Sequence, residues 1–205
     1  MRRRALLLVT VSVAAVLAGT ATGAKPFHRH VVGGQGVSVA TPPSWIAVDR
    51  RAVLSGDIVE KLSRQNPRLA PFIRPLAQPS SPLEFIAFDP AVRGGFATNV
   101  NVVVVPLAGA PTFAAYRQAL LAELRVLVPS GKVEQSVVTV HGAQALRVRY
   151  RFRLTVGTPF TVQALQYAFP RNGRSVVVTY TTLPRQASGY AATFRSSAAS
   201  IRFSR

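Results

Sequence analysis

The architecture of this chain is set by residues 142–182, which read GAQALRVRYRFRLTVGTPFTVQALQYAFPRNGRSVVVTYTT. Asn172-Gly173 is the preferred central pair of a two-residue type I′ turn, and the residues on both sides of it alternate in polarity. The turn therefore predicts a hairpin in a definite register, with one apolar and one polar face. The apolar face pairs Phe169 with Val176, Tyr167 with Val178 and Leu165 with Tyr180. The polar face pairs Gln166 with Thr179 and Ala164 with Thr181.

Four arginines follow one another at every second position of the preceding strand. We call Arg147, Arg149, Arg151 and Arg153 the arginine row. The residues between them are apolar and are expected to face the core. Through a loop over residues 155–158, the row is expected on the polar face, beside Ala164 and Gln166. A turn at His141-Gly142 places Glu134 opposite Arg149.

The arginine row is the strongest candidate for a functional site. It spans roughly 20 Å at about 3.3 Å per residue, and guanidinium groups bind phosphates and carboxylates through paired hydrogen bonds. The row is therefore a candidate anion-binding site. The alternative is a structural role, in which the arginine stems cover a solvated sheet face and Glu134 neutralises one of the four charges.

The remaining segments predict a mixed α and β architecture. Residues 112–127 form the clearest helix, because apolar residues recur there every three or four positions. That apolar stripe consists of Phe113, Tyr116, Leu120, Leu124 and Leu127. Strands are expected over residues 37–40, 84–88, 97–105 and 201–203, and further helices over residues 56–65, 66–72 and 186–200. The expected fold class is α+β, an antiparallel twisted sheet of about six or seven strands packed with α-helices.

The order of these elements resembles a known architecture. The resemblance is carried by Val39–Trp45, which ends in Pro-Pro-Ser-Trp, by the valine-rich Asn99–Val105, and by Gly142–Tyr150 with its Gly-Ala turn. Across Val37–Phe203 the chain resembles the PsbP/Mog-like α/β superfamily and, within it, the small secreted LpqN-type proteins of actinobacteria. The resemblance implies a binding or assembly accessory without a shared active site, and helices that can lie on both sides of the sheet. The chain has no Cys, so the lipid anchor of the lipoprotein members is ruled out.

The N-terminal sequence predicts export. Three arginines precede an apolar run from Ala5 to Gly19, and small residues follow up to Ala24. This pattern is typical of a secretory signal peptide, here residues 1–24, with cleavage near Ala24. Cleavage is favoured over an uncleaved anchor because the run is shorter than the roughly 20 residues of a membrane span, and a twin-arginine signal is the less favoured export route. Residues 25–36 are expected to be a flexible lead-in, and residues 37–205 a single domain that is extracellular or associated with the envelope.

The composition limits the chemistry. Lys and Arg number 25 against 7 Asp and Glu, which gives a net charge of +18, and +15 remains without the leader. Such a charge predicts anionic partners. The absence of Cys excludes disulfides, thiolate zinc sites and a cysteine nucleophile. The acidic residues are scattered, His28 and His30 lack further ligands nearby, and no catalytic motif occurs, so no catalytic residue, cofactor or metal is assigned.

The expected function is that of an exported, non-catalytic binding or accessory protein, secreted or in the cell envelope. Its basic surface suits anionic lipid headgroups or wall polymers, and we expect a monomer with a protein partner that the sequence does not identify. Two alternatives stay open: a hydrolase or other enzyme with an unrecognised pocket, and a protein that binds polyanions or nucleic acid. Export and the lack of an aromatic-interleaved RNA motif weigh against nucleic acid.

Overall fold

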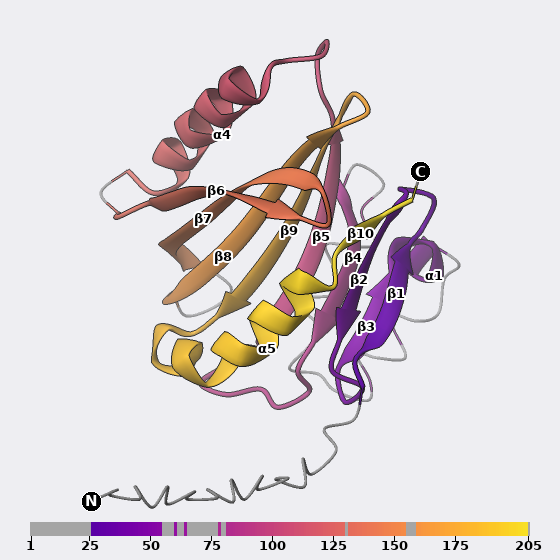
Figure 1. The fold of residues 1–205 in the computed structure, drawn as a ribbon. Helices are drawn as coiled ribbons and strands as arrows, with labels where there is room; N and C mark the ends of the chain where they lie inside the picture. The colour runs from indigo at the N-terminus through magenta and orange to yellow at the C-terminus, as the bar shows by residue number, and fades with distance from the viewer. Residues whose placement is uncertain are drawn as a thin grey trace, which may run out of the picture.

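The structure is a computed structural model that describes residues 26–54, 60, 64, 78, 81–129, 131–154 and 159–204. A seven-stranded antiparallel sheet dominates it, with a three-stranded antiparallel sheet beside it (Figure 1). In spatial order the large sheet consists of β3 (Ile46–Asp49), β4 (Leu83–Phe88), β5 (Asn99–Pro106), β9 (Arg174–Thr182), β8 (Phe160–Arg171), β7 (Ala143–Leu154) and β6 (Glu134–Val140). The small sheet consists of β1 (His28–Val32), β2 (Val37–Thr41) and β10 (Arg202–Phe203). The predicted α+β class, with an antiparallel sheet of six or seven strands, is confirmed.

The β8–β9 hairpin has the predicted register. Asn172 has a φ of 50° and Gly173 a φ of 69°, the left-handed conformation that a type I′ turn requires. Tyr167 pairs with Val178, and the pairs on both faces are those that the turn predicted.

The β6–β7 hairpin also turns where the sequence predicted. His141 and Gly142 have φ values of 46° and 77°, and Glu134 pairs with Arg149. The His141 ring lies against the end of the C-terminal helix, with Nε2 2.6 Å from the carbonyl oxygen of Ala199. The turn is therefore fixed both by its own conformation and by a tertiary contact.

Two helices cover opposite faces of the large sheet. Helix α4 (Phe113–Leu127) begins after Thr112, whose hydroxyl accepts a hydrogen bond from the backbone N–H of Ala115 at 3.2 Å. It packs on one face, in a core cluster of Leu124, Val128, Leu146, Val148, Tyr150 and Ala164. This helix and the C-terminal helix described next lie where the sequence predicted them. Leu127 is 54% exposed, however, so the prediction that it belongs to the buried stripe was wrong.

Helix α5 (Ala187–Ala199) follows a short 3₁₀ turn, η2 (Pro184–Gln186), and covers the other face. The rings of Phe194 on α5 and Tyr180 on β9 are 5.1 Å apart. Figure 1 shows α5 in front of the large sheet and beside the small sheet. The helix therefore packs against both sheets.

The segment before Val37 differs from the prediction. The sequence predicted a flexible lead-in over residues 25–36, but His28–Val32 form β1, paired with β2 from His28 opposite Thr41 to Val32 opposite Val37. Only Val32 of β1 is buried, so the strand lacks an apolar period. Its position is fixed by backbone pairing, which leaves no pattern in the side chains.

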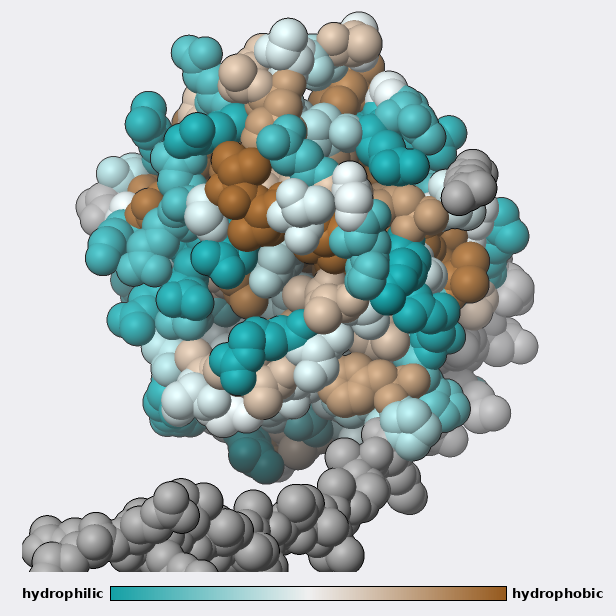
Figure 2. Space-filling view, viewed as in Figure 1, coloured by the Kyte–Doolittle hydropathy of each residue, from teal (hydrophilic) through white to brown (hydrophobic). Residues whose placement is uncertain are grey.

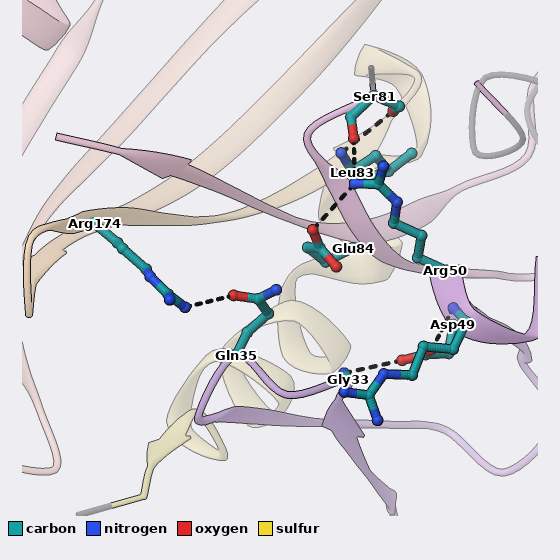
Figure 3. Close-up of polar contacts among 9 residues, drawn as sticks. Gly33, Gln35, Asp49, Arg50, Ser81, Leu83, Glu84 and Arg174 are labelled. Carbon is teal, nitrogen blue, oxygen red and sulfur yellow. Dashed lines mark hydrogen bonds and ion pairs between the residues drawn. The ribbon is translucent and has the colours of Figure 1, made fainter. Parts of the chain in front are cut away.

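Side chains tie the β1–β2 turn and the following segment to the rest of the fold (Figure 3). The backbone N–H of Gly33 donates to Asp49 Oδ2 at 3.0 Å, and Arg174 Nη1 donates to Gln35 Oε1 at 2.9 Å. Arg50, in the short helix α1 (Arg50–Leu54), is 3.2 Å from Glu84 Oε1 on β4.

Some predictions fall outside the described residues. The signal peptide over residues 1–24 lies there, as do the helices over residues 56–65 and 66–72, apart from single positions. Within the described ranges, none of the helices combines the length and apolar character needed to cross a membrane.

Candidate functional site

One face of β7 changes along its length from small buried residues to exposed arginines. Ala143 and Ala145 belong to the core cluster that includes Phe194 and Ala198 of α5. The arginine row continues the same face, and all four of its side chains are exposed. The row therefore begins where the cover of α5 ends.

The row lies on the other face of the sheet from the one that the sequence predicted. Arg149 is opposite Leu165 and Arg147 is opposite Tyr167, and directly opposite residues share a face. The row therefore does not lie beside Ala164 and Gln166. The cause is the β7–β8 connection: Leu154 pairs with Phe160, so five residues separate the paired ends, not the four of the predicted loop. A shift of one residue moves every side chain of a strand to the opposite face.

Three arginines of the row are oriented by polar side chains of β6 and β8. Arg147 Nε donates to the hydroxyl of Ser136 at 3.0 Å, and Arg151 Nε donates to the amide oxygen of Gln163 at 3.3 Å. Arg149 Nη1 is 3.5 Å from a carboxylate oxygen of Glu134. Within the described residues, the contacts of Arg147 and Arg151 engage only Nε. Their outer Nη groups are therefore available to an anion from solution.

The electrostatics of the face are strongly positive. Among the described residues it carries the arginine row and Lys132 against one carboxylate, Glu134, whose Oε1 is 3.1 Å from Lys132 Nζ. Lys132, by its hydrogen bond and its charge, and then Arg149 and Arg151 hold the pKa of Glu134 below its ordinary value. Glu134 therefore stays ionised at neutral pH, yet it can neutralise only one of the neighbouring cations.

Three shallow hollows adjoin the row. The first, of about 210 Å³, is lined by Arg147 and Arg149, and the second, of about 370 Å³, by Arg149, Arg151 and Lys132. The third, of about 460 Å³, lies between the β6–β7 turn and α5 and is lined by Arg147 and Arg195. Figure 2, seen from the same side as Figure 1, shows hydrophilic residues gathered over this side of the sheet. The arrangement is an open face suited to contact with a surface or a polymer.

The histidines and carboxylates form no catalytic arrangement in the described part of the chain. His30 shares a hydrogen bond with a hydroxyl of β2, and His141 lies against a backbone carbonyl of α5. Glu84 is paired with an arginine of α1, and Asp89 accepts a hydrogen bond from Tyr190. The described residues contain no group of three or more His, Asp or Glu that could hold a metal ion.

A second basic cluster lies at the β8–β9 turn. Arg171 and Arg174 are directly opposite each other beside the Asn172-Gly173 turn, and both line a cleft against the β1–β2 turn, residues 33–36. The register that the Asn172-Gly173 turn predicts already places the two arginines opposite each other. No local sequence pattern could predict that the β1–β2 turn packs against this hairpin, because the contacting residues Gln35 and Arg174 are 139 residues apart.

Comparison with known proteins identifies the fold. No protein-family model matches the chain, and no curated protein is similar to it in sequence. Cyanobacterial PsbP (CyanoP) from Synechocystis sp. PCC 6803 superimposes with a TM-score of 0.54 at 13% identity, covering 89% of this chain and 95% of that chain. LpqN of Mycobacterium tuberculosis, involved in cell envelope biogenesis, gives 0.53 at 14% identity, covering 87% and 92%.

The Ran-binding protein Mog1p of Saccharomyces cerevisiae gives a TM-score of 0.50 at 11% identity, covering 87% of this chain and 95% of that chain. The chain therefore has the PsbP/Mog-like fold, and the resemblance to LpqN is supported. At these identities the likeness concerns the fold, and no residue role is transferred from any of these proteins.

Proposed function

We propose that this protein is an exported, non-catalytic accessory protein that binds anionic groups of the cell envelope through the arginine row. The observation that carries the proposal is the row itself: four exposed arginines occupy every second position of β7, and one carboxylate lies beside them among the described residues. The anionic groups are lipid headgroups or wall polymers, and the experiment below separates the two.

The spacing of the row supports cooperative attraction of anions. Neighbouring arginines are two residues apart, about 7 Å along a strand, which is within the Debye length of about 8 Å at physiological salt. A basic residue near an anionic membrane surface contributes about 1 kcal/mol. Because Glu134 offsets part of the charge of Arg149, we expect the row to contribute on the order of 3 kcal/mol, or about 100-fold in affinity.

The accessory role is supported by the fold and by the N-terminal sequence. Mog1p is a Ran-binding protein and LpqN is involved in cell envelope biogenesis, and this chain shares their fold. The secretory pattern over residues 1–24 supports export. None of the four hollows described above has a histidine and a carboxylate together among its described lining residues, which gives no support to an enzymatic role.

The experiment uses protein purified from the exported fraction, with its N-terminus sequenced to test cleavage near Ala24. Binding to phosphatidylglycerol vesicles, to neutral vesicles and to purified wall polyanions is measured across a salt series. The test variant changes Arg147, Arg149, Arg151 and Arg153 to Gln. We expect this variant to lose about 100-fold in affinity for one class of anion, and the salt dependence to become shallower.

A matched control removes the same charge from elsewhere. Arg93, Arg117, Arg125 and Arg185 are exposed and lie outside the row, so changing them to Gln gives an equal net charge. If binding depended on net charge alone, the two variants would weaken equally, and the proposal would be wrong. Lack of binding by the unmodified protein to every anion would also refute it.

A further inference from the structure

A cleft of about 290 Å³ lies where the β1–β2 turn meets the β8–β9 turn. Arg171 and Arg174 line one side, the glycine-rich residues 34–36 line another, and Phe203 of β10 contributes an aromatic ring. Figure 3 shows the Arg174 side chain extending from β9 to Gln35 on the β1–β2 turn. The cleft is therefore built from the β1–β2 turn, the β8–β9 hairpin and the end of the chain around β10, three segments that are far apart in the sequence.

The two arginines of this cleft form a like-charge pair. Arg171 and Arg174 are directly opposite in the β8–β9 register, and like charges at directly opposite positions destabilise a hairpin. The contacts that hold them are neutral. The guanidinium carbon of Arg171 lies 5.0 Å from the centre of the Phe203 ring, and Arg174 Nη1 donates to Gln35 Oε1 at 2.9 Å. Among the described residues, these contacts hold the pair in position without neutralising it.

Beyond its lining, the cleft has one cation and one carboxylate against the β1–β2 turn, Arg51 and Asp49. No acidic side chain is among the described residues that line it. On the other side of the β1–β2 turn, Arg51 Nη2 lies 2.6 Å from the point where a Cβ on Gly34 would sit, and Gly34 has a φ of 70°. The position therefore favours glycine for its backbone conformation alone, because the guanidinium at the end of the flexible Arg51 side chain could move aside for a Cβ. Asp49 accepts hydrogen bonds from the backbone N–H groups of Gly33 at 3.0 Å and Arg51 at 2.8 Å.

We infer that this cleft binds the phosphate group of a small phosphate monoester. A phosphate monoester carries about two negative charges at neutral pH, which matches the two guanidinium groups of Arg171 and Arg174. Each guanidinium can donate two parallel hydrogen bonds to such a group. The volume is near the lower end of small-molecule sites, about 300 Å³, so the ester is no larger than a sugar phosphate. The site is separate from the arginine row, and the inference does not depend on the proposed function.

The test follows nuclear magnetic resonance signals of the isotope-labelled protein during titration. The reporters are the backbone amides of Gly34 and Gly36 and the side-chain Nε–H groups of Arg171 and Arg174. At constant ionic strength, glycerol 3-phosphate and inorganic phosphate are expected to shift these signals saturably. Acetate, a monoanion, is expected to require at least about tenfold higher concentration, because it offers half the charge. Vesicles of phosphatidic acid present the same monoester group on a lipid.

Variants test the roles of the two arginines. Arg171→Gln and Arg174→Gln are each expected to weaken glycerol 3-phosphate binding by about tenfold or more, the effect of one charge-assisted hydrogen bond. Gln35→Glu places a carboxylate on Arg174, so it should abolish phosphate binding and raise the melting temperature. Arg125→Gln, at an exposed position of α4, is the control and should leave binding unchanged. The variant in which the four arginines of the row are changed to Gln should also bind glycerol 3-phosphate normally. That result would distinguish binding at this cleft from binding at the arginine row.

Each result decides the inference. Saturable binding of glycerol 3-phosphate that is lost in Gln35→Glu supports a free phosphate monoester as the ligand. A response to phosphatidic acid vesicles alone, lost in the same variant, supports the phosphate group but assigns it to a lipid. The inference is overturned if no probe shifts the reporter signals saturably, or if Arg171→Gln, Arg174→Gln and Gln35→Glu bind like the unmodified protein.

Discussion

Ser197 on α5 joins the two sheets through a single hydroxyl, and its removal has a predictable cost. The side chain is buried, donates to the carbonyl oxygen of Ala40 on β2 at 2.6 Å, and accepts from the hydroxyl of Tyr180 on β9 at 3.1 Å. Ala40 lies beyond the part of β2 that pairs with β10, and its backbone N–H donates to Ser200 Oγ at 2.7 Å. Ser197 of α5 and Ser200, the residue that caps its C-terminus, thus take the place of a neighbouring strand.

The change Ser197→Ala leaves the Tyr180 hydroxyl and the Ala40 carbonyl oxygen without this partner while barely altering the side-chain volume. A buried polar group without a partner costs about 1–3 kcal/mol, so we expect the free energy of unfolding to fall by about 2–4 kcal/mol. Urea denaturation should show a lower midpoint with an unchanged slope. Ser196→Ala, at the exposed neighbouring position of the same helix, is the control and should change stability by less than about 0.5 kcal/mol.

A double-mutant cycle with Tyr180→Phe tests the cause of this loss. In the unmodified protein, Tyr180→Phe removes one donor while Ser197 keeps its bond to Ala40, so we expect a cost of about 1 kcal/mol. In the Ser197→Ala background it removes a hydroxyl that already lacks its acceptor, and it should cost nothing or stabilise. The two changes should therefore be coupled by at least about 1 kcal/mol. Additive costs, or equal stability of Ser197→Ala and Ser196→Ala, would refute the reasoning.

Two further predictions concern the tyrosines and the glycines. Burial raises the pKa of Tyr150 to about 12 and raises that of Tyr180 further, so the folded state keeps protons that the unfolded chain releases near pH 10. The stabilisation that comes from these two groups should therefore be fully present below about pH 10, and the free energy of unfolding should fall as the pH rises above it. The tyrosinate absorbance of these two residues should appear only when the protein unfolds. Ionisation of the two residues in the folded protein near pH 10 would contradict their burial. In urea denaturation, Gly189→Ala should stabilise by about 0.5–1 kcal/mol, because the position is helical and open, whereas Gly142→Ala should cost about 1 kcal/mol at its φ of 77°. Equal effects of the two glycine changes would contradict the assigned conformations.

Sequence reasoning succeeded where a short turn determines the pairing. Asn172-Gly173 and His141-Gly142 each fix their hairpin, because two residues with positive φ leave a single register. It failed at the β7–β8 connection, where Leu154 pairs with Phe160 across a longer loop. Longer loops accept several registers with little difference in free energy, and an error of one residue reverses both faces.

Long-range packing explains the other failures. β1 has one buried residue and pairs with β2 through its backbone, so its sequence resembles that of a loop. The cleft between the β1–β2 and β8–β9 turns likewise depends on a contact between Gln35 and Arg174, which no periodicity encodes. Local patterns predict the elements and their near neighbours, whereas contacts between distant segments follow from the assembled fold.

The exposure of the arginine row follows from the lengths of the elements, and the sign of its charge does not. β7 has 12 residues, and on this face only Ala143 and Ala145 belong to the core cluster that includes Phe194 and Ala198 of α5, so the long side chains further along the face meet solvent and need a polar end. Residues of both signs would satisfy this need with less repulsion, as Glu134 does on the adjacent strand. A bias of the genome toward arginine would explain why the chain has 22 Arg and 3 Lys, but not why it has only 7 Asp and Glu. The repeated positive charge in the row and in the Arg171–Arg174 pair is therefore the feature that folding alone leaves unexplained, and the anion binding proposed at both places would account for it.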